Sequence, residues 1–211
     1  MAMTTPHVCS CAGESVPPSV FAAAAIILAG GSSRRMGQDK SMLLIKGKPI
    51  IELIRDQLRP LFGQRIIISA NDPVRYAFLG LPVVTDESAG QGPLMGIACG
   101  LRASPCDVNL VIACDIPRID AALVNQLIDR IGENDVMLPR TAGGNFEPLF
   151  AVYRKSILPL IDAALRRGIR RIIDVFDGAR VGILAIDDAP WLRNLNTPAD
   201  YREFVSGDGR E

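Results

Sequence analysis

At 211 residues, of which 48% are hydrophobic, the chain is long enough to bury one substantial core and short for two independent ones. Its 23 basic and 23 acidic residues cancel, so no positive excess points to DNA or RNA as a partner. No apolar stretch reaches bilayer-spanning length, and no Lys or Arg precedes the apolar residues 21–29, so we expect neither membrane insertion nor secretion.

The cysteines favour a reducing compartment. They are odd in number and irregularly spaced, and three fall in segments expected to be core, which is not the pattern of a disulfide framework. The five are Cys9, Cys11, Cys99, Cys106 and Cys114. We therefore expect a cytoplasmic protein. His7 lies near the first two cysteines, but weakly spaced ligands in a tail do not make a zinc site, and we assign none.

The predicted elements form one α/β domain. Residues 1–19 are proline-rich with little apolar pattern and are expected to be a flexible tail, which leaves residues 20–211 as the domain. Strands are predicted at residues 21–28, 64–70, 82–85, 108–114, 135–138, 147–153 and 181–186. Helices are predicted at residues 49–60, 94–103, 121–131, 155–166 and 198–205. This alternation predicts a single doubly wound, mostly parallel sheet with helices on both faces.

The first predicted strand runs into residues 28–40, whose sequence is LAGGSSRRMGQDK. Gly30 and Gly31 can take positive φ and let backbone N–H groups converge on an anion. Arg35 and Lys40 add positive charge that suits phosphate oxygens. Neither the Walker A spacing nor the dinucleotide fingerprint is present. The segment therefore indicates another kind of triphosphate-binding loop, and the alternative is a surface turn that happens to carry charge.

Polar and glycine-rich segments follow the next predicted strands. Asn71 and Asp86 each come just after a strand, so they are expected at the same sheet edge and are site candidates by position. A glycine-rich loop then enters a helix opened by Pro93, whose N–H groups and dipole can bind a phosphate or a base edge. The alternative is a strand-to-helix turn with close helix packing through Gly96 and Gly100.

The apolar run of residues 108–114 stops at Asp115, which places a carboxylate where α/β sites are built. This position suits a Mg²⁺ ligand, because Mg²⁺ takes one or two carboxylates plus substrate phosphate oxygens and water. Alternatively, Asp115 is the N-cap of the next helix, ahead of Pro117.

Two later segments have structural explanations of their own. In residues 194–200, Thr197 is a natural N-cap and Pro198 suits the first helical position. A basic patch is formed by Arg166, Arg167, Arg170 and Arg171. Such a patch is usually a solvated helix face, and its alternative role is to meet a second anionic substrate.

Four motifs, taken together and in this order, resemble the molybdenum cofactor guanylyltransferases, the MobA family. They are residues 28–40, 92–96 (GPLMG), 114–117 (CDIP) and 194–198 (NLNTP), and the resemblance runs from about residue 22 to residue 205. It implies a Rossmann-like nucleotidyltransferase fold and transfer of GMP from GTP to the terminal phosphate of molybdopterin, with pyrophosphate released. It also implies Mg²⁺ as cofactor and transient contact with cofactor-making proteins and recipient molybdoenzymes.

The resemblance also implies roles for individual residues. Contacts to GTP would fall on Leu28, Ala29, Gly30, Gly31, Lys40, Asn71, Asp86, Gly92, Pro93, Leu94 and Asp115. Lys40, Arg35 and Asp115 would act in catalysis, and Asp115 would hold the metal. Asn194 and Asn196 would lie on the pterin side.

Two other functions stay open. Related cytidylyltransferases usually have Leu-Ala-Ala-Gly in the first loop and lack Gly-Pro-Leu-x-Gly in the second, so Gly30 and residues 92–96 favour guanine. A cytidylyl or sugar-phosphate nucleotidyltransferase would share the same chemistry with another base or acceptor. A nonenzymatic nucleotide sensor would bind GTP without releasing pyrophosphate.

Overall fold

The computed structural model describes residues 21–29, 39–88, 90–187, 192, 194–195 and 197–207. The predicted tail at residues 1–19 lies outside this range and stays a prediction. Gly30, Gly31, Arg35 and Asn196 also lie outside the described residues.

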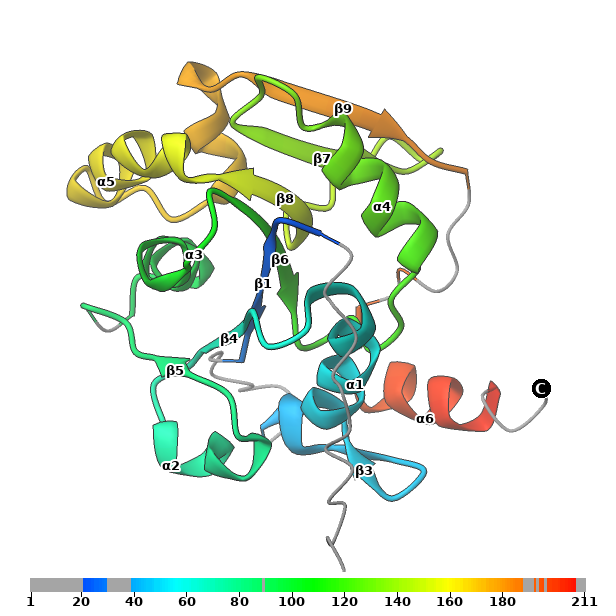
Figure 1. Cartoon of the computed structure of the whole chain (residues 1–211). Coiled ribbons are helices and arrows are strands. Elements are labelled where there is room, and N and C mark those ends of the chain that lie inside the picture. The colour runs from blue at the N-terminus through cyan, green and yellow to red at the C-terminus, as the bar shows by residue number, and fades with distance from the viewer. Residues whose placement is uncertain are drawn as a thin grey trace, which may run out of the picture.

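Within the described residues, a seven-stranded sheet has the order β5-β4-β1-β6-β8-β7-β9 (Figure 1). Its strands are β1 (Ala24–Leu28), β4 (Ile66–Ser69), β5 (Val83–Val84), β6 (Val108–Ala113), β7 (Val136–Arg140), β8 (Phe150–Arg154) and β9 (Val181–Ala185). Neighbouring strands pair in parallel except at β8, which runs antiparallel to both β6 and β7. The prediction of a mostly parallel sheet is confirmed, and each predicted strand overlaps an observed one.

Helices cover both faces of the sheet, as predicted (Figure 1). They are α1 (Ile50–Phe62), α2 (Pro73–Tyr76), α3 (Pro93–Ala103), α4 (Ala121–Arg130), α5 (Leu158–Arg166) and α6 (Pro198–Gly207). Apolar residues of α3 and α5 pack in one hydrophobic cluster, and those of α1 and α4 pack in another with α6 against it. No helix in the described part of the chain is long and apolar enough to cross a bilayer.

Short elements complete the chain. They are the 3₁₀ helices η1 (Lys40–Met42), η2 (Ala77–Leu79), η3 (Lys155–Ile157) and η4 (Ile172–Gly178), and a hairpin of β2 (Leu44–Ile45) and β3 (Lys48–Pro49). η3 falls within the helix predicted at residues 155–166. The sequence did not predict the other short elements or α2, because two to seven residues are too few to show a hydrophobic period.

The first helix starts within one residue of the predicted Pro49, and the predicted end at Pro60 was wrong. Pro49 is not the first helical residue, because it pairs with Leu44 in the hairpin and the helix begins at Ile50. The helix also continues through Pro60 to Phe62. Phe62 is fully buried and packs against Phe21 with ring centroids 5.7 Å apart, so tertiary packing holds the last turn despite the proline.

Two structural interpretations of the sequence are confirmed. Thr197 caps α6, since its Oγ1 accepts a hydrogen bond from the Asp200 amide at 3.2 Å and Asp200 Oδ2 accepts one from the Thr197 amide at 2.7 Å. Gly100 allows close packing of α3 on β1, because a Cβ there would lie 2.5 Å from Ile26 Cγ2.

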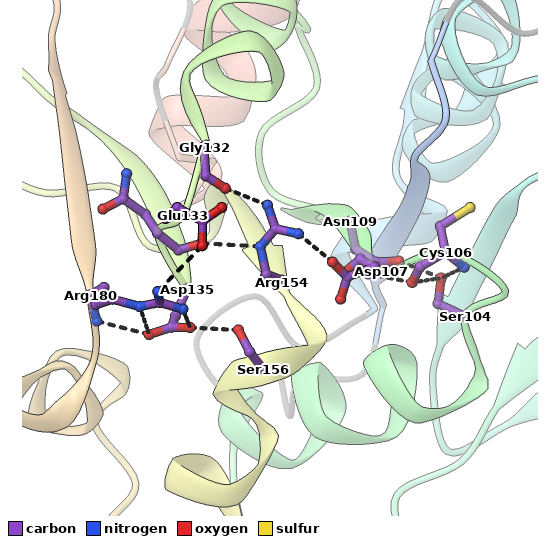
Figure 2. Close-up of polar contacts among 11 residues, drawn as sticks. Ser104, Cys106, Asp107, Asn109, Gly132, Glu133, Asp135, Arg154, Ser156 and Arg180 are labelled. Carbon is purple, nitrogen blue, oxygen red and sulfur yellow. Dashed lines mark hydrogen bonds and ion pairs between the residues drawn. The ribbon is translucent and has the colours of Figure 1, made fainter.

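A polar network joins strand ends at the edge of the sheet opposite the carboxyl ends of its parallel strands (Figure 2). Asp135, just before β7, accepts hydrogen bonds from Ser156 Oγ at 2.5 Å and from Arg180 N and Nη2 at 2.9 and 3.1 Å. Arg154 donates to the Gly132 carbonyl at 2.5 Å and to the Asp107 carboxylate. The hydrogen bonds from Arg180 lower the pKa of Asp135 to about 2. This network stabilises the fold at a distance from the candidate site described below.

We expect Asp135→Asn to lower the free energy of unfolding at neutral pH by about 1–3 kcal/mol, because an amide cannot replace a buried carboxylate bonded to Arg180. The folded-state pKa is below the ordinary value of about 3.9. The stabilisation is therefore present above about pH 4 and is lost as the pH falls towards about 2. Urea unfolding of both proteins across this range measures the difference.

Asp174→Asn is the matched control, since Asp174 is exposed and its Oδ1 lies 3.8 Å from Arg171 Nη1. We expect that control to change the unfolding free energy by less than about 0.5 kcal/mol. Equal losses in both variants, or an Asp135 effect that is the same at both ends of the pH range, would contradict the prediction.

Candidate active site

The ends of four parallel strands meet at one edge of the sheet, where backbone hydrogen bonds continue past the strands. Ala29 N donates to Ser69 O at 2.9 Å, and Cys114 N donates to Leu28 O at 3.1 Å. Ala70 N donates to the carbonyl at the end of β5, also at 2.9 Å. Residues that follow β1, β4, β5 and β6 are thereby brought together, as the sequence predicted for a doubly wound sheet.

A cavity of about 600 Å³ lies at this edge. Seven of the residues predicted to form the site line it: Leu28, Lys40, Asn71, Asp86, Gly92, Pro93 and Asp115. Residues that were not among the predicted site residues also line it: Asp39, Ser69, Ala70, Gly90, Gly96, Ala113, Cys114 and Leu149. Most of the second group are small or apolar and give no chemical signal in a sequence, whereas Asp39 directly precedes Lys40.

Lys40 and Asp115 form the charged centre of the cavity. Lys40 is the first residue of η1, and Asp115 is the second residue after β6. The Lys40 Nζ lies 3.7 Å from Oδ2 of Asp115. The two side chains are only 16% and 22% exposed, so water screens their attraction less than at an open surface. Burial raises the pKa of Asp115, and the charge of Lys40 opposes that shift. The N-cap alternative for Asp115 is wrong, because Asp120 caps α4 by accepting from the amides of its first turn.

One oxygen of Asp115 fits a metal ligand. Its Oδ1 is buried and accepts no hydrogen bond from the described residues. The described residues contain no group of three or more His, Cys, Asp or Glu side chains able to hold a metal, so an all-protein cage is not available among them. A cation held by one carboxylate together with substrate phosphate oxygens matches this donor set.

The charge balance of the lining also favours a cation with the substrate. Asp39, Asp86 and Asp115 line the cavity, and Lys40 is the cation that faces them among the described lining residues. Burial and then the charge of Asp115 raise the pKa of Glu147, so the field of the existing carboxylates disfavours a further negative charge beside them. A triphosphate entering this cavity therefore needs positive charge beyond that of Lys40.

Asn71 and Asp86 are hydrogen-bonded to each other beyond the carboxyl ends of β4 and β5. Asn71 Nδ2 donates to Asp86 Oδ2 at 2.9 Å, and the Asp86 amide donates to Asn71 Oδ1 at 2.9 Å. The position-based expectation that these two residues share an edge is confirmed. Their mutual hydrogen bonds give the cavity a fixed polar wall.

The start of α3 also lines the cavity. Gly92 is the N-cap with φ 73°, a conformation that L side chains rarely adopt, and Pro93 follows as the first helical residue. No side chain caps this helix end, Pro93 has no N–H, and the Met95 amide donates to the Gly92 carbonyl at 3.2 Å. A Cβ at Gly96 would lie 2.8 Å from Ser69 Oγ and 3.3 Å from Leu28 Cδ2, which shows how closely α3 approaches the sheet here.

Three predicted site residues lie beside the cavity and do not line it. Ala29 is buried and its carbonyl accepts from the Tyr76 hydroxyl at 2.8 Å. The Leu94 side chain is fully buried in the hydrophobic cluster of α3 and α5. Asn194 is placed near the site by its neighbour Leu195, whose amide donates to the Asp115 carbonyl at 2.9 Å.

Cys114 directly precedes Asp115 and carries a thiol, which is a potential nucleophile. Whether this thiol is protonated therefore bears on the mechanism. Burial, followed by the charge of Asp115, raises the pKa of the Cys114 thiol to about 12. The thiol therefore stays protonated at neutral pH and is a poor nucleophile. The chemistry that the site supports is charge stabilisation rather than covalent attack by cysteine.

Comparison with known proteins places this site in context. The family model described as "MobA-like NTP transferase domain" matches residues 25–181. "Probable molybdenum cofactor guanylyltransferase" of Carboxydothermus hydrogenoformans is 37% identical over 186 residues, covering 85% of this chain and 93% of the relative. The molybdenum cofactor guanylyltransferase of Vibrio cholerae is 34% identical over 182 residues, covering 85% of this chain and 89% of the relative.

A solved structure shares the fold. The crystal structure of molybdopterin-guanine dinucleotide biosynthesis protein A from Archaeoglobus fulgidus superposes with a TM-score of 0.74 at 23% identity. The match covers 89% of this chain and 99% of that one. The predicted Rossmann-like nucleotidyltransferase fold is confirmed.

We expect Gly96→Ala to weaken GTP binding by about tenfold, because the added methyl displaces Ser69 and Leu28, which both line the cavity. Equilibrium dialysis with labelled GTP measures the dissociation constant. Gly100→Ala is the matched control, since its methyl collides with Ile26 in the core of the same helix contact. We expect the control to be less stable but to bind GTP with wild-type affinity when folded. Equal GTP affinity of the two variants would refute the role of Gly96 in shaping the cavity.

Proposed function

The chain belongs to the molybdenum cofactor guanylyltransferases of the MobA-like NTP transferase family, and on this basis we propose how its site transfers GMP from GTP to molybdopterin. The acceptor is the terminal phosphate of the pterin, and the products are molybdopterin guanine dinucleotide and pyrophosphate. The observation that carries the proposal is the shielded Lys40–Asp115 pair, 3.7 Å apart, in a cavity at the carboxyl edge of the sheet.

The transfer is a direct displacement at phosphorus. An oxygen of the pterin phosphate forms a bond to the α-phosphorus of GTP, while the bond from that phosphorus to the α,β-bridging oxygen breaks. Pyrophosphate leaves with the electron pair of the broken bond. The protonated thiol of Cys114 gives no reason to invoke a covalent enzyme intermediate. Positioning and electrostatic stabilisation therefore account for the catalysis.

Lys40 is the residue proposed to stabilise the charge that grows on the leaving pyrophosphate. Its Nζ is held at the cavity by Asp115 and carries a charge that phosphate oxygens can share. Gly30, Gly31 and Arg35 are proposed to complete the phosphate contacts from the adjoining segment. Because they lie outside the described residues, their roles rest on the sequence motif.

Asp115 is proposed to hold Mg²⁺ through its buried, unpartnered Oδ1. When bound there, Mg²⁺ would supply the positive charge that the acidic lining of the cavity lacks and would neutralise phosphate oxygens. Lys40 and Asp115 are both needed in this arrangement, because the lysine acts on the phosphates directly and the aspartate acts by holding the cation.

The remaining contacts follow from the walls of the cavity. Leu28, Gly92 and Pro93 are proposed to enclose the nucleotide, and Asn71 with Asp86 is proposed to bind its base or ribose. The amide of Leu94 stands in the first turn of α3, although its side chain is buried in the core.

The pterin side is proposed to include Asn194 and Asn196, since the segment that carries them is bonded to the Asp115 backbone through Leu195. A cytoplasmic location and transient contact with cofactor-making proteins and recipient molybdoenzymes are further proposals that follow from family membership.

The decisive test of this function is pyrophosphate release by the purified protein with Mg²⁺ and molybdopterin, supplied with GTP, CTP, ATP or UTP in parallel. We expect release with GTP and formation of the guanine dinucleotide. A preference for CTP would move the chain to the cytidylyl branch. Binding of GTP with no release under these conditions would instead favour a nucleotide sensor.

We expect Asp115→Asn to reduce the rate of transfer by about a hundredfold or more, because the amide loses the negative charge that holds the cation. The fold should persist, since the residue is not part of either hydrophobic cluster. Single-turnover rates with saturating GTP, together with unfolding curves, separate the two effects.

Asp120→Asn is the matched control, because asparagine caps a helix about as well as aspartate and Asp120 caps α4 outside the cavity. Its transfer rate should equal that of the wild type. If Asp115→Asn behaved like this control, Asp115 would have no part in the mechanism.

A further inference from the structure

Tyr76, the last residue of α2, contacts three positions around the candidate site that are far from it in the sequence. Its hydroxyl oxygen lies 2.8 Å from the carbonyl of Ala29, 2.9 Å from Asp39 Oδ2 and 3.0 Å from Ser41 Oγ. The side chain is 1% exposed. Asp39 and Ser41 are the two sequence neighbours of Lys40, so one buried hydroxyl contacts the chain on both sides of that lysine.

Asp39 is the charged partner in this cluster. Its carboxylate accepts hydrogen bonds from Ser41 N at 3.0 Å, from Ser41 Oγ at 2.7 Å and from Arg75 Nη1 at 2.7 Å, in addition to Tyr76. Burial opposes ionisation of Asp39, but the hydrogen bonds from Ser41, Arg75 and Tyr76 outweigh it and hold the pKa below its ordinary value. Burial raises the pKa of Tyr76, so the phenol stays neutral, and the Ala29 carbonyl and Asp39 Oδ2 share its single proton.

The Tyr76 hydroxyl contacts more polar groups than a buried phenol needs to satisfy its own hydrogen bonding. Tyr153, which is equally buried, has a single bond of this kind, from its hydroxyl to the Pro148 carbonyl at 2.7 Å. One such partner satisfies a tyrosine donor. The additional partners of Tyr76 are the N-cap of η1 and the residue after Lys40, and both belong to the short element that carries the lysine.

We propose that Tyr76 is a positioning residue for Lys40. Through Asp39 and Ser41 it fixes the backbone of η1 against the end of β1, at Ala29, and so holds the Lys40 amine beside Asp115 before substrate binds. The long lysine side chain loses conformational entropy when it becomes ordered. If the backbone of η1 is already fixed, less entropy is lost when Lys40 binds a phosphate. The role rests on the proposed function only in assigning Lys40 to the GTP phosphates.

Tyr76→Phe tests this role, because it removes the hydroxyl and keeps the buried ring. We expect the KM for GTP to rise, or kcat/KM to fall, by about tenfold while the circular dichroism spectrum is unchanged. Tyr153→Phe is the matched control, since it deletes one hydroxyl from an equally buried ring. That control should alter the unfolding midpoint and leave the kinetic constants for GTP unchanged.

The variant should be repeated in the Lys40→Ala background, where a residue that acts through Lys40 has nothing left to position. There we expect Tyr76→Phe to cause no further loss in kcat/KM for GTP. A tenfold loss that is the same with and without Lys40 would overturn the proposal, as would wild-type kinetics for the single variant.

Hydrogen exchange of the wild type and both phenylalanine variants, measured without substrate, gives a readout that does not depend on the reaction. We expect faster exchange in peptides covering residues 39–45 for Tyr76→Phe and not for Tyr153→Phe. Unchanged exchange would refute the positioning role even if the enzyme is active. Conversely, a wild type that releases no pyrophosphate with GTP would refute the proposed function, while the exchange result would still decide whether Tyr76 fixes η1.

Discussion

The burial of β1 between β4 and β6 is the constraint on which the site depends. Its five residues are all buried, so both faces of the strand are covered and its register with each neighbour is fixed by packing as well as by hydrogen bonds. The ladder continues past the strand, where Ala29 bonds to Ser69 and Leu28 to Cys114. Because the ladder reaches this edge without a break, the packing of the core fixes where Asp115 and the start of the proposed phosphate-binding motif lie along the sheet.

The sequence predicted those parts of the molecule that have a local signature. The sheet, its main helices and the edge that carries Lys40 and Asp115 followed from apolar runs that end in polar residues, and the structure agrees. The missed features depend on contacts between distant segments. The first helix passes Pro60 because Phe62 is buried, and Asp39 acquires its role from Arg75 and Tyr76, which lie 36 and 37 residues further along the chain. A sequence motif of a few residues cannot reveal a contact between residues so far apart in the chain.

The site contains more negative than positive charge among its described residues, which is an unexpected property for a cavity proposed to receive a triphosphate. Asp39 is the least available of the lining carboxylates, because Arg75 and Ser41 already occupy its oxygens. Asp86 is likewise engaged by Asn71. Asp115 keeps one buried oxygen without a partner, so the lining carboxylates divide into two that shape the wall and one that is free to hold a cation.

The short helix α2 joins the two sides of this wall. Immediately before it, Asn71 bonds to Asp86 on the side of β5, and at its end Tyr76 bonds to Asp39 on the side of Lys40. Asp72 caps the helix and Pro73 fixes its first turn, so the separation between these two anchors is set by four residues of rigid backbone. The wall formed by Asn71 and Asp86 and the element that carries Lys40 are therefore attached to the two ends of the same helix. In this architecture one short helix holds both sides of the cavity, the side proposed for the nucleotide and the side proposed for its phosphates.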